Sequence, residues 1–585
     1  MSADESIEAA PAETFAIGIS FGNSNSSIAY TSGEGKAEVI ANEEGDRQIP
    51  SFLSYIEGEE YHGAQAKSQL VRNSKNTVAY FRDYIGKDFD SIDPTPCHAS
   101  AHAQKHESTI AFSVQDTNSD SPSTLSVSEI ATRHIRRLAS SASDFLGKKV
   151  NAAVLTIPTN FSDEQKEALS ESAKNAGIEI LQFISEPVAA VLAYDARAEA
   201  IISDKIVVVA DLGGIRSDVA VVASRGGMYS ILSTAHDYET AGTQLDQVLI
   251  DHFAKEFIKK HKTDPRQNER SLAKLKLEAE ATKKALSLGS SASLSVESLA
   301  DGVDFSSTIN RTRYELLGGK VFSGFIRLIE EAVRKADLDV LDINEVILSG
   351  GTSHTPLIAR RLTSLFPQTT NILSPSTLAS ALNPSELPSR GAAIQASLIS
   401  AYDPSDIAQN THPALTATPH LSRAIGVLVI SDSESRGVFK PLLEAETAVP
   451  ARRAGLFAVP GGGGDVLVKV CEGQREIKVS KPEPKSKSKP QVNGKAGSED
   501  DGDEDDDEDE EEEEEEEIRE TIWKVGTVLA EAAIRATKKG AKVEVTVNVG
   551  ADLGVTITAR EVGGKGGVRG QLLEKGGGGR ENGSA

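Results

Sequence analysis

The chain has 585 residues, of which 39% are hydrophobic and 25% are charged, and its formal net charge is −25. A chain of this length is too long for one hydrophobic core, so two or more domains are expected. Of the 19 residues from 499 to 517, 18 are acidic, which leaves the rest of the chain at only −7 and without the basic surplus that nucleic-acid binding requires.

Two cysteines, Cys97 and Cys471, occur without a CxxC motif, which excludes a disulfide framework and a structural zinc site. The first 14 residues are acidic and lack the apolar segment of a signal peptide, and no run of about 18 uncharged apolar residues follows. We therefore expect residues 1–14 to be disordered, and the protein to be cytoplasmic and to make no membrane contact.

Strands alternate with helices over residues 15–402, which predicts an α/β domain. The apolar spacing before Gly147 predicts an amphipathic helix that ends at this glycine and is followed by a buried strand from residue 152. Ser162 and Gln165 form a capping box, so a second helix is expected to begin there and to end at Gly177.

The segments 15–30 and 205–223 share one plan: an apolar strand, a turn of small residues and a second strand. This repeat predicts two homologous lobes that grip a ligand between their turns. A third glycine turn, from Gly350 to Ser353, follows another apolar strand and precedes a predicted helix. Glycine turns let backbone N–H groups approach phosphate, and the GxxxxGK[ST] motif is absent, so the three turns together predict a phosphate site outside the P-loop class.

The C-terminal part has a different organisation. Residues 403–421 are rich in Pro and Thr and are predicted to be a linker. Period-two alternation predicts a small β-domain in two parts, 422–480 and 519–562, with a turn at GADLG in the last hairpin. The basic and then acidic insertion 481–518 and the Gly-rich tail 563–585 have little to bury and are predicted to be disordered.

Several of these motifs resemble one known family in the same order along the chain. They are residues 41–52, 155–165, 184–194, 211–219 and 347–358. Over residues 15–400 the sequence is similar to the seventy-kilodalton heat-shock (DnaK-type) chaperones. This resemblance implies an actin-like, two-lobed ATPase domain, followed by a shortened β-sandwich domain for peptides that has no helical lid.

The chain departs from the family at positions that carry catalysis. The family's magnesium-organising Asp corresponds to Ser20, and its catalytic Lys corresponds to Arg82. In the second turn, Ile215 and Arg216 replace a glycine and a hydroxyl residue. Because phosphoryl transfer depends on positioning and charge, the resemblance implies ATP binding with little or no hydrolysis and no catalytic residue or protein metal ligand.

Other matching positions keep their residue types, including the acidic Glu186, Asp211 and Asp218, and a helix face with Glu280, Lys283 and Ser287 is implied to contact adenosine. Arg82 and Arg216 are expected to neutralise ATP without magnesium, unless both face solvent. The implied ATP contacts are Gly22, Asn23, Ser24, Asn25, Arg82, Glu186, Asp211, Gly213, Gly214, Ile215, Arg216, Gly242, Glu280, Lys283, Lys284, Ser287, Gly350, Gly351, Thr352 and His354.

The substituted turns and the missing lid resemble the atypical branch of the family found in the fungal ribosome-associated complex. This resemblance implies a stable heterodimer with the J-domain protein zuotin, at the ribosome, which stimulates a partner chaperone of the same family on nascent chains. Three alternatives stay open: a conventional ATP-hydrolysing chaperone, a nucleotide-exchange relative and an actin-like sugar kinase. The acidic run is either a solvated spacer or a segment that repels rRNA or binds basic tails.

Overall fold

The structure is a computed structural model. It describes residues 15–92, 100–107, 109–117, 121–197, 205–225, 228–400, 419, 421–431, 434–443, 447, 449–459, 464–480, 518–537, 541–563 and 567–572. The chain divides into one unit of residues 1–420 and 446–448 and a second unit of residues 421–445 and 449–585. The predictions of disorder for 1–14 and for the acidic insertion, and of a linker at 403–421, fall almost entirely outside the described residues.

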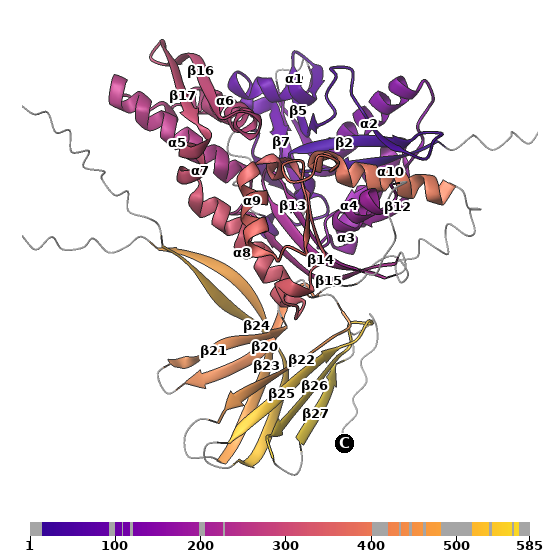
Figure 1. Ribbon diagram of the computed structural model, residues 1–585, viewed down its shortest axis with the longest axis vertical. Coiled ribbons are helices and arrows are strands. Elements are labelled where there is room, and N and C mark those ends of the chain that lie inside the picture. The colour runs from indigo at the N-terminus through magenta and orange to yellow at the C-terminus, as the bar shows by residue number, and fades with distance from the viewer. Residues whose placement is uncertain are drawn as a thin grey trace, which may run out of the picture. The chain divides into compact units, whose positions relative to one another are not determined.

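The first unit contains two sheets with the same topology (Figure 1). In each, an antiparallel three-stranded meander is extended from its first strand by two parallel strands. The first sheet has the order β12-β11-β1-β2-β3, with β1 Ala16–Phe21, β2 Asn25–Thr31, β3 Ala37–Ile40, β11 Ala152–Ile157 and β12 Glu179–Ser185, and β4 Ile49–Pro50 pairs with β2. The second has the order β15-β14-β13-β18-β19, with β13 Lys205–Leu212, β14 Ser217–Arg225, β15 Met228–Asp237, β18 Glu345–Ser349 and β19 Asn371–Leu373. The predicted α/β class and the predicted repeat of the two hairpins are confirmed.

Helices cover the sheets where the apolar periodicity predicts them. Helix α2 (Val127–Leu146) ends at Gly147, whose φ of 62° gives the left-handed cap that glycine accepts without strain. Helix α3 (Asp163–Asn175) begins with the predicted capping box of Ser162 and Gln165. Both predicted helices are confirmed, and α2 buries its apolar face in the core of the first lobe.

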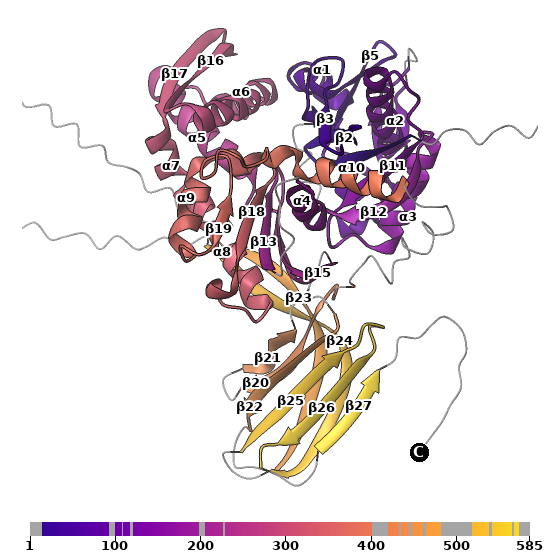
Figure 2. The same ribbon diagram turned by 45° about the vertical axis from the view of Figure 1, so that its right-hand side comes forward.

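Two helices are exchanged between the lobes (Figure 2). Helix α4 (Glu186–Asp195) follows the last strand of the first sheet, yet its apolar residues pack in one cluster with β13 of the second sheet. Helix α10 (Leu387–Ser400) follows the second sheet and packs against Val154 and Ile184 of the first. The two helices cross so closely that a Cβ on Gly391 would lie 2.7 Å from the Cα of Ala189.

Smaller elements complete each lobe. The first lobe also contains β5 Phe52–Ile56, β6 Glu59–His62, α1 Gly63–Ser68, β7 Thr77–Ala79, β8 Ala103–His106, β9 Thr109–Val114 and β10 Ser123–Ser126. The second also contains α5 Gly242–His261, α6 Glu269–Leu288, β16 Ser291–Ala300, β17 Val303–Asn310, α7 Arg311–Leu317, α8 Gly319–Lys335 and α9 Pro356–Leu365. Among the described residues, no helix is both long and apolar enough to span a membrane.

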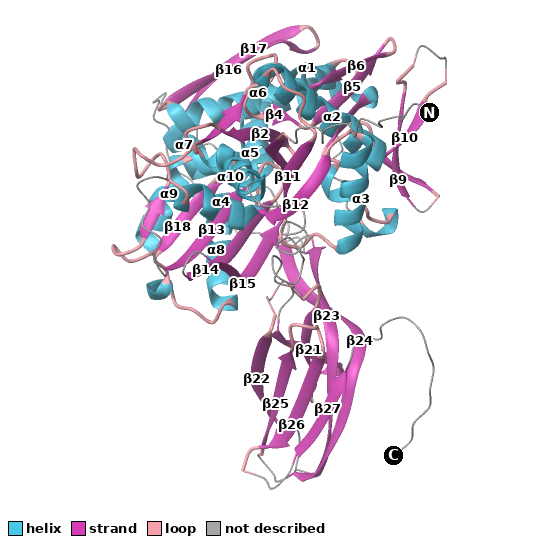
Figure 3. Ribbon diagram, turned by 90° about the vertical axis from the view of Figure 1, so that its right-hand side faces the viewer, coloured by secondary structure: helices cyan, strands magenta, loops and turns pink. Residues whose placement is uncertain are grey.

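The second unit consists of two four-stranded sheets that share one apolar cluster (Figure 3). One has the order β21-β20-β23-β24, with β20 Ala424–Ser431, β21 Glu434–Leu443, β23 Gly464–Ser480 and β24 Ile518–Thr537. The other has the order β22-β25-β26-β27, with β22 Ala451–Ala458, β25 Lys542–Val549, β26 Val555–Glu561 and β27 Gly567–Leu572. The predicted turn at residues 550–554 joins β25 to β26.

One expectation needs correction here. The prediction of a disordered tail from residue 563 is wrong for 567–572, because β27 pairs with β26. An edge strand forms through backbone hydrogen bonds, which the glycines of this segment can still make. The acidic insertion lies between β23 and β24, which pair with each other along most of their length.

Candidate functional site

The three predicted glycine turns come together in the first unit. Residues 22–24 join β1 to β2, residues 213–216 join β13 to β14, and Gly350 follows β18 and precedes a short 3-10 helix, Gly351–His354. The hydroxyl of Thr352 donates to the carbonyl of Gly213 at 2.9 Å, which fixes the third turn on the second. A Cβ on Gly214 would lie 2.5 Å from the Ser24 hydroxyl, so the turns of the two lobes are in contact.

Two glycines are required by close packing. Gly350 has a φ of +81°, and a Cβ there would lie 2.6 Å from Oδ1 of Asp211. A Cβ on Gly242, the first residue of α5, would lie 2.6 Å from the Thr352 hydroxyl. The N–H groups of both glycines already donate within the protein, Gly350 to the carbonyl of Pro384 and Gly242 to that of Gly213, so the missing side chains serve the close approach of the turns to one another.

Arg82 lies deep in the first lobe and is 6% exposed. Its Nε donates to Asp83 at 2.8 Å and its Nη1 donates to Glu186 at 3.0 Å. Its backbone N–H donates to Oδ1 of Asn23 at 3.1 Å, which connects it to the first turn. The solvent-facing alternative is therefore wrong for Arg82.

Arg216 is also 6% exposed, so the solvent-facing alternative is wrong for this residue as well. Its guanidinium binds both oxygens of Asp218 and donates to Oδ1 of Asn160 at 2.8 Å. It also donates to the Tyr238 hydroxyl at 3.2 Å, and that hydroxyl donates to Asp83 at 2.8 Å. The two arginines thus belong to one buried polar network, and the neighbouring Ile215 is buried as well.

The carboxyl groups of this network differ in their protonation. Burial raises the pKa of Glu186, and the negative charges of Asp211 and Asp218 raise it further despite Arg82. Burial and the Asp218 charge likewise raise the pKa of Asp211. Burial opposes the ionised form of Asp83 too, but Arg82 and Arg216 hold its pKa well below the usual range. The centre therefore combines one firmly ionised carboxylate with two carboxyls that resist ionisation.

The face of α6 that was predicted to contact adenosine lies beside α5 and the second and third turns. Lys283 donates to the carbonyl of Gly242 at 2.9 Å and to Asp246 at 2.8 Å, which places it beside the second and third turns. Glu280 pairs instead with Lys67 of α1 at 2.5 Å and with Lys284 at 2.8 Å. Burial opposes ionisation of Glu280, but Lys67, Lys284 and Lys283 lower its pKa to about 2.

Three other residues that were predicted to contact ATP, Lys284, Ser287 and His354, lie at the edge of the site formed by the turns and α6. Lys284 is 68% exposed, and the Ser287 hydroxyl donates to a carbonyl of its own helix, so among the described contacts neither reaches the three turns. His354 bonds the Ser385 hydroxyl at 3.1 Å, and burial lowers its pKa.

The Lys67–Glu280 pair bridges the two lobes above the turns, and both side chains are less than a quarter exposed. Replacement of Lys67 by alanine is expected to lower the free energy of unfolding of this unit by about 1 kcal/mol, because it leaves Glu280 with fewer partners. Chemical denaturation measures the loss. The control is Lys105→Ala, which breaks an exposed pair with Asp90 and should stay within about 0.5 kcal/mol; equal losses would contradict the prediction.

Sequence reasoning missed several residues of the network. Asp83 follows Arg82 directly, and this acidic neighbour was the available signal. Asn160, Tyr238 and Lys67 come from distant segments without a motif of their own. Asp246 lies four residues, or about one helical turn, after Gly242 at the start of α5, so the two residues share one face of this helix.

Comparison with known proteins identifies the family. The family model described as Hsp70 protein matches residues 16–494, and the chain belongs to the Hsp70 family. The mixed α/β unit described above fits the actin-like ATPase domain expected of such a protein.

Among the similar proteins is the ribosome-associated complex subunit SSZ1 of Saccharomyces cerevisiae, 43% identical over 95% of this chain and 99% of that protein. A heat shock protein 70 homolog of Schizosaccharomyces pombe is 44% identical over 94% of both chains. The heat shock 70 kDa protein 14 of Danio rerio is 30% identical over 79% of this chain and 89% of that protein.

Proposed function

We propose that this Hsp70-family chain binds ATP between the three glycine turns and hydrolyses it little or not at all. The observation that carries the proposal is the network around Arg82. The guanidinium that stands at the family's catalytic lysine position is tied to Asp83 and Glu186, where it cannot take up the position of a free ammonium beside an attacking water. Loss of one charge-stabilising group costs about a hundred- to a thousand-fold in rate, and Ser20 and Ile215 add further losses.

The residues present fit a phosphate chain. Gly213, Gly214 and Gly350 let the three turns approach one another, since a Cβ on them would overlap Arg216, Ser24 and Asp211 respectively, and Lys283 lies beside Gly242. When bound, ATP would bring four negative charges to this centre at most. In the proposed arrangement the residues expected to contact it remain those predicted from the sequence, with the glycine turns around the phosphates and Lys283, Ser287 and His354 toward the nucleoside.

We propose further that magnesium contributes little. Arg82 and Arg216 already have carboxylate partners, so phosphate must share them with these carboxylates. The raised pKa of Glu186 lowers the cost of sharing Arg82, because a protonated carboxyl releases its arginine more readily than an ionised one.

Calorimetric titration with ATP tests this proposal. We expect the same affinity, within about threefold, with magnesium and with excess EDTA, because the arginines supply the neutralising charge. Arg216→Ala should weaken ATP binding about tenfold or more, the loss of one charge-assisted contact. The control Arg560→Ala removes an exposed ion pair in the second unit and should have no effect. Abolition of binding by EDTA would contradict the magnesium proposal.

A single-turnover assay separates this function from a conventional chaperone ATPase. Bound ATP should remain uncleaved over many minutes, with or without an added J-domain. Cleavage stimulated by a J-domain would assign the chain to the hydrolysing class, and the network around Arg82 would then be a resting state.

For the cellular role, we propose a cytoplasmic, ribosome-associated co-chaperone. Support comes from the relative named as a subunit of the ribosome-associated complex, which this chain matches nearly end to end. We propose a heterodimer with a zuotin-like J-domain protein that stimulates a partner chaperone on nascent chains. Purification of the tagged protein from cell extract at high salt should retain one J-domain protein in a one-to-one ratio, and its absence would contradict the heterodimer.

We also propose a nucleotide-binding domain over 15–402 and a lidless β-sandwich that begins at 422, extends through β27 to 572 and is interrupted by the insertion 481–517. The shared apolar cluster of the two C-terminal sheets supports the sandwich. Deletion of residues 499–517 should leave the unfolding transition and ATP affinity unchanged, since the strands on either side pair without it.

A further inference from the structure

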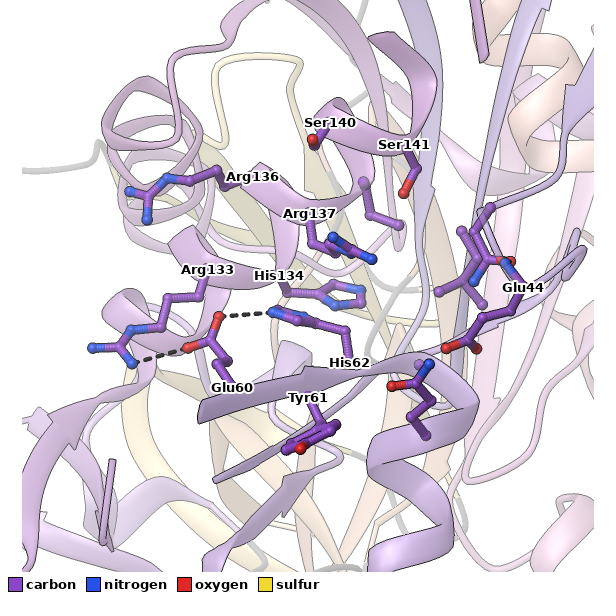
Figure 4. A pocket seen from close by; sticks show the side chains of 15 residues that line it. Glu44, Glu60, Tyr61, His62, Arg133, His134, Arg136, Arg137, Ser140 and Ser141 are labelled. Atoms are coloured by element: carbon purple, nitrogen blue, oxygen red, sulfur yellow. Dashed lines mark hydrogen bonds and ion pairs between the residues drawn. The ribbon is translucent and has the colours of Figure 1, made fainter. Parts of the chain in front are cut away.

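A polar pocket of about 390 Å³ lies in the first lobe, and none of its lining residues belongs to the three turns. Helix α2 forms one wall, and β6 with the start of α1 forms the other (Figure 4). His134 of α2 and His62 of β6 lie next to each other in the middle of the pocket (Figure 4). A volume of this size accommodates a small organic molecule.

A chain of hydrogen bonds leads from His134 to the first turn. The Ser51 hydroxyl donates to the carbonyl of Gly22 at 2.7 Å. Its single proton is then used, so the Ser26 hydroxyl, 2.9 Å away, must donate to Ser51. Ser26 in turn must accept from Nε2 of His134 at 3.0 Å. This order assigns the Nε2–H tautomer to His134 and connects the pocket to the turn expected to hold phosphate.

The other ring nitrogen of His134 is a buried acceptor without a partner. His134 is 1% exposed, and its Nδ1 makes no hydrogen bond in the described structure. Burial and the nearby His62 lower the pKa of His134 to about 3, so the ring is neutral and Nδ1 keeps its lone pair. Phe21 and Phe81 pack against the ring with centroids at 5.4 and 5.9 Å, which holds it in place. An unpaired buried acceptor costs about 1–3 kcal/mol, and a ligand donor would remove that cost.

Three arginines and two glutamates, Glu44 and Glu60, line the pocket. Arg133 is neutralised by three carboxylates, those of Glu60, Glu129 and Asp116. Arg137 has one carboxylate, Glu43, at 3.3 Å. Arg136 donates to a backbone carbonyl, and among the described residues no carboxylate pairs with it. Guanidinium groups favour carboxylate or phosphate oxygens as partners.

We propose that this pocket binds a small organic anion that carries its own hydrogen-bond donor, with its anionic group at Arg136 and Arg137 and its donor at His134 Nδ1. A bound donor polarises the imidazole and strengthens the bonds through Ser26 and Ser51 to Gly22. Occupation of the pocket is thereby coupled to nucleotide binding, and linkage requires that ATP change the affinity of the anion by the same factor. The coupling rests on the ATP site proposed above, whereas binding to the pocket does not.

The test uses the full-length chain with nitrogen-15-labelled histidine. L-malate is the probe, and succinate is its control, because it has the same two carboxylates but lacks the hydroxyl donor. We expect malate to move the Nδ1 resonance of His134 in the nucleotide-free protein, and succinate to leave it in place. An unmoved resonance with malate, or equal shifts with both acids, overturns the assignment of a donor site.

Variants then separate the site from the coupling. Arg136→Gln should weaken malate binding about fivefold or more, whereas Arg360→Gln, an exposed arginine paired with Glu315 in the second lobe, should not. In calorimetry, malate should change ATP affinity at least threefold, and Ser51→Ala should remove this effect while malate still binds. Unchanged ATP affinity overturns the coupling alone. Failure of ATP to bind at all overturns the proposed function, and the malate arm of the experiment still decides the pocket.

Discussion

Replacement of Gly391 by alanine is expected to destabilise the first unit by about 3 kcal/mol or more, or to prevent its folding, because one added methyl group must enter the crossing of α10 and α4. The Cβ would lie 2.7 Å from the Cα of Ala189, and the obstructing atoms are backbone that no side-chain rotation can move aside. Gly18→Ala should act similarly, since its Cβ would lie 2.6 Å from the carbonyl oxygen of Ser389 in the same helix. Equilibrium denaturation measures both losses.

Gly319→Ala is the matched control for this change. Gly319 begins α8, and an added Cβ would meet no atom within 4 Å. The substitution is expected to be neutral or to stabilise by about 0.5 kcal/mol, since alanine restricts the unfolded chain. If Gly391→Ala unfolded at the same denaturant concentration as Gly319→Ala, the close crossing of the two helices would be wrong.

The second large effect is expected at Arg82. Arg82→Met keeps most of the side-chain volume but removes the charge, which leaves Glu186 buried without the arginine it pairs with and Asp83 with fewer partners. Breaking a buried ion pair from one side costs about 3–5 kcal/mol. Chemical denaturation at about pH 8.5 should show this loss. Addition of Glu186→Gln should restore about 2 kcal/mol at this pH, because it removes the carboxyl that has lost its arginine.

The pH dependence provides an independent check on this variant. The pKa of Glu186 is raised in the folded protein, so its burial costs stability; this cost is complete above the folded pKa and disappears as the pH falls from there toward the unfolded pKa. Without Arg82 the pKa rises further, so the deficit of Arg82→Met should be larger at about pH 8.5 than at about pH 6.5. Asp83 has a lowered pKa and contributes stability that is lost only in acid, below its unfolded pKa, so it adds no slope in this window. A deficit that grows toward acid would contradict the assignment to Glu186.

The local signals in the sequence predicted backbone structure well. Gly147 and the box of Ser162 and Gln165 act within one helical turn, so they determine the helix ends wherever the helix packs. The repeated hairpins predicted the two sheets for the same reason, because each strand pairs with its neighbour in the chain. The strand β27 was missed, since its glycines carry no side-chain pattern and its formation depends on the edge offered by β26.

Of the candidate site, the sequence predicted the glycine turns and the residues that match motifs of the family. Arg82 and Arg216 were expected to face phosphate, yet their partners Asn160, Tyr238 and Asp83 were not foreseen, because no sequence spacing connects these segments. Burial of two arginines in one network depends on the closing of both lobes, which is a property of tertiary packing. The pocket around His134 escaped notice for the same reason, since its two histidines are far apart in the sequence.

The exchange of α4 and α10 also has a consequence for the order in which the chain can fold during synthesis. The face of the first sheet that contains Val154 and Ile184 is complete once residue 185 has been made, but of the two helices that pack in its cluster, α4 follows at once and α10 begins only at residue 387. The second sheet finds its own partner helix, α4, already synthesised. Domains usually complete their folding from the N-terminus onward. Here the half that is made first must wait with an apolar face only partly covered, and the half that is made last can close at once.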